Sequence, residues 1–146
     1  MSRVPKLLII NGPNLNLLGK REPDIYGQQT LEDIETILSS RYHPHRAELE
    51  FFQSNVEGEI INKIHEAHAL QLSGIIINPG AYTHYAIGIH DAIKAISVPA
   101  IEVHISNIHA REEFRQKSVI APAAIGQISG LGVKSYMLAI EYFLLD

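Results

Sequence analysis

The stretch that decides the fold is GIIINPGAYTH, residues 74–84, which begins as a strand and ends in a polar turn. Its three successive isoleucines, residues 75–77, form an unbroken apolar run. Such runs are typical of parallel strands, because helices cover both faces of a parallel sheet. The Pro79-Gly80 pair that follows favours a turn. The stretch therefore predicts a strand of a parallel sheet at 74–78, followed by a polar loop.

The rest of the chain alternates short apolar runs with segments of helical periodicity, which is typical of βα units. Capping boxes are predicted from Thr30 to Asp33 and from Ser54 to Glu57. Together the pattern predicts five strands and five helices in an α/β, flavodoxin-like three-layer sandwich with a five-stranded parallel sheet. The expected strands are 6–11, 47–52, 74–78, 99–105 and 124–129, and the helices that can be assigned to residues are 30–41, 54–70, 84–96 and 133–144.

The composition predicts one catalytic domain over residues 1–146, because 146 residues are enough to bury a core. The absence of cysteine excludes disulfides, thiolate metal sites and a cysteine nucleophile. A formal charge of −4 without a basic stripe argues against nucleic acid as a partner. The apolar run at 7–10 is too short for a membrane span, which needs ~20 residues. We therefore expect a cytoplasmic protein with no membrane partner.

Polar segments follow the first, third and fourth predicted strands. In open α/β sheets, ligands bind outside the carboxyl ends of the strands. The segments at 11–29, 78–84 and 102–115 should therefore meet at one edge of the sheet. Each has an ordinary structural explanation by itself: Asn-Gly-Pro-Asn at 11–14 is a common turn string, and a lone histidine such as His104 is more often a hydrogen-bonded core residue. Their convergence on one edge indicates a functional site.

Taken in order along the chain, these segments resemble the type II 3-dehydroquinate dehydratases. The block at 102–115 is the most specific part of the resemblance, which covers almost the whole chain at matching spacing. The matching strings are INGPNLNLLG at 10–19, REP at 21–23, YG at 26–27, FQSN at 52–55, EG at 57–58, NPGA at 78–81, TH at 83–84, IEVHISN at 101–107, HAREEFR at 109–115 and GLG at 130–132.

This resemblance implies an enzyme that removes water from 3-dehydroquinate to give 3-dehydroshikimate. The reaction is a step of the shikimate pathway and serves quinate breakdown in some organisms, and the sequence leaves these two uses open. The resemblance also implies a flavodoxin-like fold, no metal and no other cofactor. Its expected assembly is a homododecamer built from four trimers.

By the same resemblance, five residues carry the chemistry. Tyr26 is the base that takes the proton next to the substrate ketone; a free phenol has a pKa of ~10, and Arg21 on the same loop stabilises its charged form. His104 is the general acid that protonates the departing hydroxyl. Glu102 lies two residues earlier on the same strand face and supports His104. Asn14 helps to hold the enolate through an ordered water.

The resemblance implies further residues that bind the substrate. Asn78, His84 and Arg115 grip the ring hydroxyls. The substrate carboxylate lies on the backbone N–H groups of Ile105 and Ser106, together with the Ser106 hydroxyl.

Two more binding residues lie near loops or subunit contacts. The resemblance places Arg111 on a loop near the catalytic tyrosine, and Asp91 in the site of a neighbouring subunit. Many members of the family have Thr-Ser after the Thr-His pair, and an arginine before the aspartate. Here the residues are Tyr85, Ala86 and His90, so the chain departs from the family pattern near the expected subunit contact and beside Asp91.

Other chemistries fit the sequence less well. A Schiff base needs a desolvated lysine at a strand end, but only Lys20 lies near the site, on the loop beside Arg21. A metal site needs clustered ligands, and His104 and His109 lack the usual helical spacing. The alternative from another class is a flavodoxin-like binding or signalling module without catalysis. A nucleotide-binding module would need a glycine-rich turn where the chain has Gly12-Pro13-Asn14. A phosphoacceptor module would need an acidic pair at the end of the first strand, where the chain has Asn11.

Overall fold

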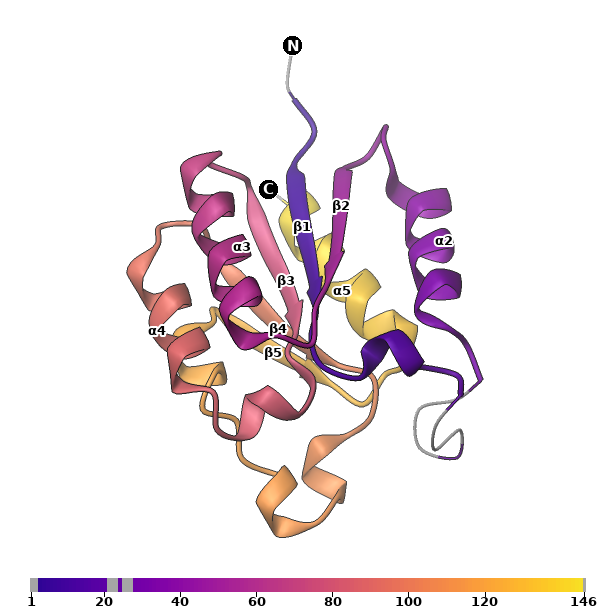
Figure 1. The fold of residues 1–146 in the computed structure, drawn as a ribbon. Helices are drawn as coiled ribbons and strands as arrows, with labels where there is room; N and C mark the ends of the chain where they lie inside the picture. Colours follow the sequence, from indigo (N-terminus) through magenta and orange to yellow (C-terminus); the bar gives the residue numbers. More distant parts are fainter. Residues whose placement is uncertain (1–2, 21–23, 25–27, 146) are drawn as a thin grey trace.

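The computed structural model describes residues 3–20, 24 and 28–145, and its centre is one sheet of five parallel strands. The strands lie in the order β2-β1-β3-β4-β5, which is the flavodoxin-like order. Helices α2 and α5 cover one face of the sheet, and α3 and α4 cover the other (Figure 1). This confirms the predicted three-layer sandwich. The elements are β1 (Lys6–Asn11), α2 (Leu31–Tyr42), β2 (Glu48–Gln53), α3 (Glu57–Ala69), β3 (Gly74–Asn78), α4 (Ile87–Ala95), β4 (Ala100–His104), β5 (Gly126–Ser129) and α5 (Val133–Leu144).

The two faces of the central strands build two separate hydrophobic cores. Along β1, Leu7 and Ile9 pack with side chains of α2 and α5, whereas Leu8 and Ile10 pack with side chains of α3 and α4. The three isoleucines of β3, residues 75–77, divide between the two cores in the same alternating manner and are fully buried. Burying one such side chain contributes about 1.5–3 kcal/mol. The apolar run that predicted the strand is therefore also a main source of its stability.

The helix starts bear out one predicted capping box and correct the other. Thr30 Oγ1 accepts from the backbone N–H of Asp33, and the Thr30 N–H donates to Asp33 Oδ2, both at 3.0 Å. The box predicted from Ser54 to Glu57 is wrong, because α3 begins at Glu57 with Val56 as its N-cap, two residues later than that pattern requires. Ser54 Oγ instead accepts from the backbone N–H of Val56 at 2.9 Å and donates to Glu59.

Four α-helices lie wholly within the described ranges, and Asp24 is a further helical residue, so the prediction of five helices stays a prediction. The helix expected at 84–96 is α4, which begins only at Ile87 because Tyr85 leaves helical geometry at φ −154°; the residues before Tyr85 form a 3₁₀ turn, η2 (Gly80–His84). The connection from β4 to β5 is built from three short 3₁₀ turns, η3 (Ile108–Ala110), η4 (Glu113–Arg115) and η5 (Ala121–Ala123). No helix in the described part of the chain is long and apolar enough to cross a membrane.

The loops that leave β1 and β3 are in direct backbone contact, and this contact shapes the edge of the sheet. Asn11 and Asn78 are register partners at the ends of these strands, and the Gly12 N–H donates to the carbonyl of Asn78 at 2.8 Å. A Cβ on Gly12 would lie 2.5 Å from the carbonyl oxygen of Pro79. Gly80, in the loop after β3, lies equally close to the loop after β1. It has a φ of +58°, and a Cβ there would lie 3.1 Å from the carbonyl oxygen of Pro13. Glycine is therefore required at residue 12 for the two loops to meet.

We expect the substitution Gly12→Ala to push these loops apart and to destabilise the protein. Steric overpacking of this kind typically costs about 1–3 kcal/mol, which corresponds to a melting temperature lower by roughly 3–10 °C. Thermal unfolding followed by circular dichroism measures the shift. The matched control is Gly58→Ala in α3, where nothing lies within 4 Å of the added Cβ and alanine favours the helix. Equal melting temperatures for the two variants would contradict the steric argument.

Candidate active site

A cavity of about 140 Å³ lies at the carboxyl ends of β1, β3 and β4, at the edge where the sequence predicted a site. The loops that follow these strands supply its wall. Apolar side chains that the sequence analysis did not single out, those of Leu15, Leu18 and Ile108, line part of it. The cavity brings together eight of the predicted site residues, which are Asn14, Asn78, His84, His104, Ile105, Ser106, Arg111 and Arg115.

Four predicted site residues are not part of the described cavity wall. Glu102 is fully buried behind His104 and contacts it directly. Asp91 is exposed on α4, so its expected role in the site of a neighbouring subunit stays a prediction. Arg21 and Tyr26, the predicted activating arginine and base, lie outside the described residues.

His104 and Glu102 form a buried pair at the end of β4. They lie two residues apart on one strand, so both side chains point to the same face of the sheet. Glu102 is 0% exposed and His104 is 5% exposed, and His104 Nε2 is hydrogen-bonded to Glu102 Oε2. A carboxylate can only accept, so Nε2 carries the hydrogen and Nδ1 is the nitrogen left for other chemistry. The pair is thus a histidine whose orientation is fixed by a buried anion.

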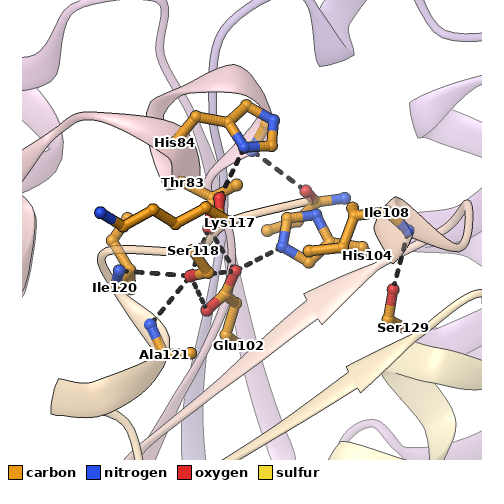
Figure 2. Close-up of polar contacts among 12 residues, drawn as sticks. Thr83, His84, Glu102, His104, Ile108, Lys117, Ser118, Ile120, Ala121 and Ser129 are labelled. Carbon is orange, nitrogen blue, oxygen red and sulfur yellow. Dashed lines mark hydrogen bonds and ion pairs between the residues drawn. The ribbon is translucent and has the colours of Figure 1, made fainter. Parts of the chain in front are cut away.

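Two hydroxyl groups that the sequence analysis did not single out complete the surroundings of Glu102. Thr83 Oγ1 donates to Glu102 Oε2, and Ser118 Oγ lies 2.8 Å from Oε1 and 3.0 Å from Oε2 (Figure 2). Thr83 is part of the Thr-His pair that matches the family at 83–84. Ser118 lies outside the matching strings, three residues after the one at 109–115. Nothing in local periodicity singles out Ser118, because only the tertiary structure brings it beside β4.

These contacts keep Glu102 ionised. Burial raises the pKa of the Glu102 carboxyl, but the hydrogen bond and the charge of His104 together with the two hydroxyls outweigh it and hold the pKa below its usual value. A carboxylate that accepts several hydrogen bonds is stabilised in its charged form. Glu102 is therefore a buried negative charge that accepts a hydrogen bond from His104 Nε2.

His84 is held in one tautomer by the backbone. Its Nδ1 lies 2.8 Å from the carbonyl oxygen of Lys117, and a carbonyl only accepts, so Nδ1 carries the hydrogen. In the neutral ring Nε2 is then an acceptor. Because His84 lines the cavity, it is able to receive a hydrogen bond from a ligand hydroxyl.

Asn14 is positioned by an unusual backbone conformation. It has a φ of +69°, which asparagine tolerates better than most residues, and its N–H donates to Asn55 Oδ1 at 2.9 Å. Gln53 Nε2 donates to the carbonyl of Gly12 at 3.1 Å, and Tyr82 Oη donates to the carbonyl of Asn55 at 2.6 Å. These contacts from β2 and η2 brace the loop after β1 and fix where Asn14 enters the cavity.

The backbone carbonyl groups at the end of β4 accept hydrogen bonds from the loop before α5 and from the first turn of that helix. Gly130 N–H and Ser135 Oγ donate to the carbonyl of His104 at 3.1 and 3.0 Å, and Gly132 N–H donates to that of Ile105 at 3.0 Å. Within the described ranges, the N–H groups of Ile105 and Ser106 donate to no backbone carbonyl in the loops. Two backbone donors at the cavity wall are thus available to an anion such as a carboxylate.

A buried tyrosine from α5 links the ends of β1 and β3. Tyr136 is fully buried; its Oη donates to Asn11 Oδ1 at 2.5 Å and accepts from Asn78 Nδ2 at 2.9 Å. Burial raises the pKa of Tyr136, so the phenol stays protonated and able to donate. Asn78 Oδ1 also accepts from the Gly80 N–H at 3.2 Å. The amide of Asn78 therefore keeps one hydrogen and one lone pair for a ligand, in a fixed orientation.

The charge of the cavity suits an anionic ligand. Arg111 and Arg115 line it, and none of the described lining residues is acidic. Arg115 Nε lies 2.9 Å from Glu112 Oε2, and its guanidinium stacks 4.9 Å from the centre of the Phe114 ring. No group of three or more histidine or carboxylate side chains in the described part of the chain is arranged to hold a metal ion.

The chain is similar to known proteins of one family. The family model described as dehydroquinase class II matches residues 5–144. The chain is 64% identical over 135 residues to the 3-dehydroquinate dehydratase of Caldicellulosiruptor bescii, covering 92% of this chain and 93% of that protein. It is 56% identical over 141 residues to the 3-dehydroquinate dehydratase of Bacillus subtilis, covering 97% and 95%. The crystal structure of the type II dehydroquinase from Butyrivibrio crossotus superposes with a TM-score of 0.93 at 49% identity, covering 96% of this chain and 97% of that one.

The depressed pKa of Glu102 predicts a pH-dependent contribution to stability. Because the folded-state pKa lies below the ordinary 4.5, this contribution is present above pH 4.5 and is lost as the pH falls through the lower folded value. We expect Glu102→Gln to lower the melting temperature near pH 7 by about 2–10 °C, and the gap to narrow as the pH falls below 4.5. Thermal unfolding between pH 3 and pH 7 measures the gap, with the exposed Glu48→Gln as the control. A gap that is independent of pH would contradict an ionised Glu102.

The link through Tyr136 predicts a second effect on stability. Tyr136→Phe leaves Asn11 Oδ1 and Asn78 Nδ2 buried without this partner, which typically costs about 1–3 kcal/mol. We expect a melting temperature lower by roughly 2–10 °C. The control Tyr142→Phe removes a hydroxyl from an exposed residue of the same helix and should leave the melting temperature nearly unchanged. A Tyr136→Phe protein as stable as the control would show that the three-residue link contributes nothing.

Proposed function

Because this chain belongs to the class II dehydroquinase family, we propose that it is a 3-dehydroquinate dehydratase whose single domain, residues 1–146, eliminates water by acid–base chemistry of its own side chains. The observation that carries the proposal is His104 at the wall of a cavity, held by the buried Glu102 behind it, with His84, Arg115 and the residues Ile105 and Ser106 in the same wall. A dehydration needs an acid for the departing hydroxyl, and this pair supplies one. The reaction belongs to the shikimate pathway, and we expect it to take place in the cytoplasm.

The substrate would be held through its carboxylate and its ring hydroxyls. The N–H groups of Ile105 and Ser106, with the Ser106 hydroxyl, would bind the carboxylate, because no acidic group among the described lining residues repels it. Asn78, His84 and Arg115 would bind the hydroxyls. His84 suits this role because its Nδ1 is already used by the Lys117 carbonyl, so Nε2 is the acceptor that faces a ligand.

The reaction would then proceed through an enolate. The phenolate of Tyr26, stabilised by the nearby charge of Arg21, would take the proton next to the ketone. The electron pair moves onto the ketone oxygen, where Asn14, working through an ordered water, would stabilise the negative charge. Collapse of the enolate forms the conjugated double bond and breaks the carbon–oxygen bond of the departing hydroxyl. Protonated His104 would give its Nδ1 proton to that hydroxyl, which leaves as water.

Glu102 has a supporting part in this scheme. A buried carboxylate next to Nε2 stabilises the charged imidazole and fixes the direction of Nδ1. After the reaction the proton taken by Tyr26 and the one lost by His104 must be exchanged with solvent before the next turnover. Arg111 would lie near Tyr26 when substrate is bound.

Assembly is the remaining part of the proposal. We expect a homododecamer of four trimers, with Asp91 of one subunit reaching the site of its neighbour. Its exposure on α4 is consistent with such a contact. His90, on the same helix, has its Nδ1 2.8 Å from the carbonyl oxygen of Val119, so it is engaged within the subunit. Tyr85, with 61% of its surface exposed, is the altered residue that is free to shape an interface.

The decisive experiment mixes the purified protein with 3-dehydroquinate and follows the conjugated enone product by ultraviolet absorbance. We expect turnover by the parent and a loss of about 10²–10⁴-fold in kcat for Tyr26→Phe, the usual range for removing a general base. Tyr142→Phe, at an exposed tyrosine outside the cavity wall, is the matched control and should retain full activity.

Two other outcomes of this assay would contradict parts of the proposal. Turnover by both the parent and Tyr26→Phe would keep the reaction and remove Tyr26 as the base. No turnover by a well-folded parent would reject the dehydratase and bring forward a flavodoxin-like binding module without catalysis.

A further inference from the structure

Thr83 and Ser118 surround Glu102 without lining the cavity. Glu102 is contacted by His104 from its own strand, by Thr83 from η2 and by Ser118 from the segment between η4 and η5. Neither hydroxyl belongs to the cavity wall, so neither is placed to touch a ligand. Three parts of the chain thus converge on one buried carboxylate, and the hydroxyls of Thr83 and Ser118 have no part in the proposed reaction so far.

The hydrogen-bond donors around Glu102 can be named from its contacts. Ser118 Oγ accepts from the N–H groups of Ile120 at 3.2 Å and Ala121 at 2.9 Å, which leaves its hydroxyl as a donor, and it lies 2.8 Å from Glu102 Oε1 (Figure 2). Thr83 Oγ1 donates to the same carboxylate, 2.7 Å from Ser118 Oγ. With the hydrogen on His104 Nε2, three donors face two carboxylate oxygens. This arrangement suits an ionised carboxylate and leaves no good position for a proton on Glu102.

We propose that Ser118 and Thr83 are positioning residues for catalysis, which hold Glu102 ionised and in one orientation so that His104 directs its Nδ1 proton into the cavity. The catalytic consequence rests on the proposed dehydratase function. The effect on the ionisation of Glu102 does not, because it follows from the hydrogen bonds alone.

The segment that carries Ser118 also orients the second histidine of the cavity. The Val119 N–H donates to the carbonyl of Thr83 at 2.7 Å, and the carbonyl of Lys117 accepts from His84 Nδ1 at 2.8 Å. Residues 117–119 therefore act on His84 directly and on His104 through Glu102. The segment directly follows the loop that supplies Arg111 and Arg115. One continuous stretch, residues 111–119, therefore supplies the two arginines and contacts the groups that orient the two histidines.

Other charged groups face the same cavity and are common to the parent and every variant. They are His84 from η2, His104 from β4, and Arg111 and Arg115 from the loop between β4 and β5; Lys117 is exposed beside Ser118. A comparison between the parent and a variant without one hydroxyl therefore isolates the contribution of that hydroxyl.

The first test is kinetic. Ser118→Ala and Thr83→Val should lower kcat by about 10–100-fold, which is the kinetic equivalent of losing a hydrogen bond to a charged group, while KM stays within about threefold. The acidic limb of the pH profile of kcat should move to higher pH, because Glu102 with fewer donors is protonated more readily. Thr83→Ser keeps the hydroxyl and should retain activity.

The matched control is Ser54→Ala. Ser54 is a buried serine that, like Ser118, donates to a glutamate (Glu59) and accepts from a backbone N–H, but it lies on the β2 side of the fold and outside the cavity wall. It should leave kcat and its pH profile unchanged. If Ser118→Ala and Thr83→Val behave like this control, or lose activity with the acidic limb unmoved, the two hydroxyls support only the fold and the proposal is overturned.

The second test does not depend on activity. Carbon-13 NMR of labelled glutamate carboxyl groups, with the Glu102 signal assigned through Glu102→Gln, follows the ionisation of Glu102 directly. Its titration midpoint should be higher in Ser118→Ala than in the parent and in Ser54→Ala. An unchanged midpoint would overturn the proposal even in an active enzyme. A raised midpoint in a protein without dehydratase activity would support the role of the hydroxyls and reject the function instead.

Discussion

The arrangement at the carboxyl edge of the sheet depends on one buried negative charge, that of Glu102. A carboxylate taken out of water is costly unless hydrogen bonds and an opposite charge compensate for it. Here the compensation comes from His104, Thr83 and Ser118, which lie on three different segments. Those segments must meet for the charge to be tolerated, so the same requirement that stabilises Glu102 also fixes the orientation of a histidine in the cavity wall.

The parallel sheet makes this meeting possible. All five strands end at the same edge, so the loops after β1, β3 and β4 share one space even though they are far apart in sequence. The contact between Gly12 and Pro79 and the hydrogen bonds of Tyr136 then set the distance between two of these loops to a narrow range. The two cores, one on each face of the sheet, stabilise the fold. This stability offsets the cost of burying polar groups at the edge of the sheet.

Much of the fold and of the cavity wall was predictable from sequence, for identifiable reasons. The isoleucines at 75–77 predicted a strand covered on both faces, and Thr30 with Asp33 predicted a helix start, because both signals are local. The rule that ligands bind at the carboxyl ends of parallel strands placed Asn14, Asn78 and His104 in one cavity. The second capping box failed because Ser54 Oγ accepts from the N–H of Val56, the residue that caps α3, and the local pattern does not distinguish this contact from a capping box.

The sequence by itself determined the alternation of strands and helices, the family, and the residue types that the proposed chemistry needs, because these depend on periodicity and on short ordered motifs. Only the tertiary structure decided which groups support them. Ser118 reaches Glu102 across 16 residues and Tyr136 reaches Asn11 across 125. The tautomers of His84 and His104 likewise follow from partners that the fold brings near. Hydrogen bonds act over about 3 Å, so partners distant in sequence are set by how the chain packs, and no local pattern encodes that packing.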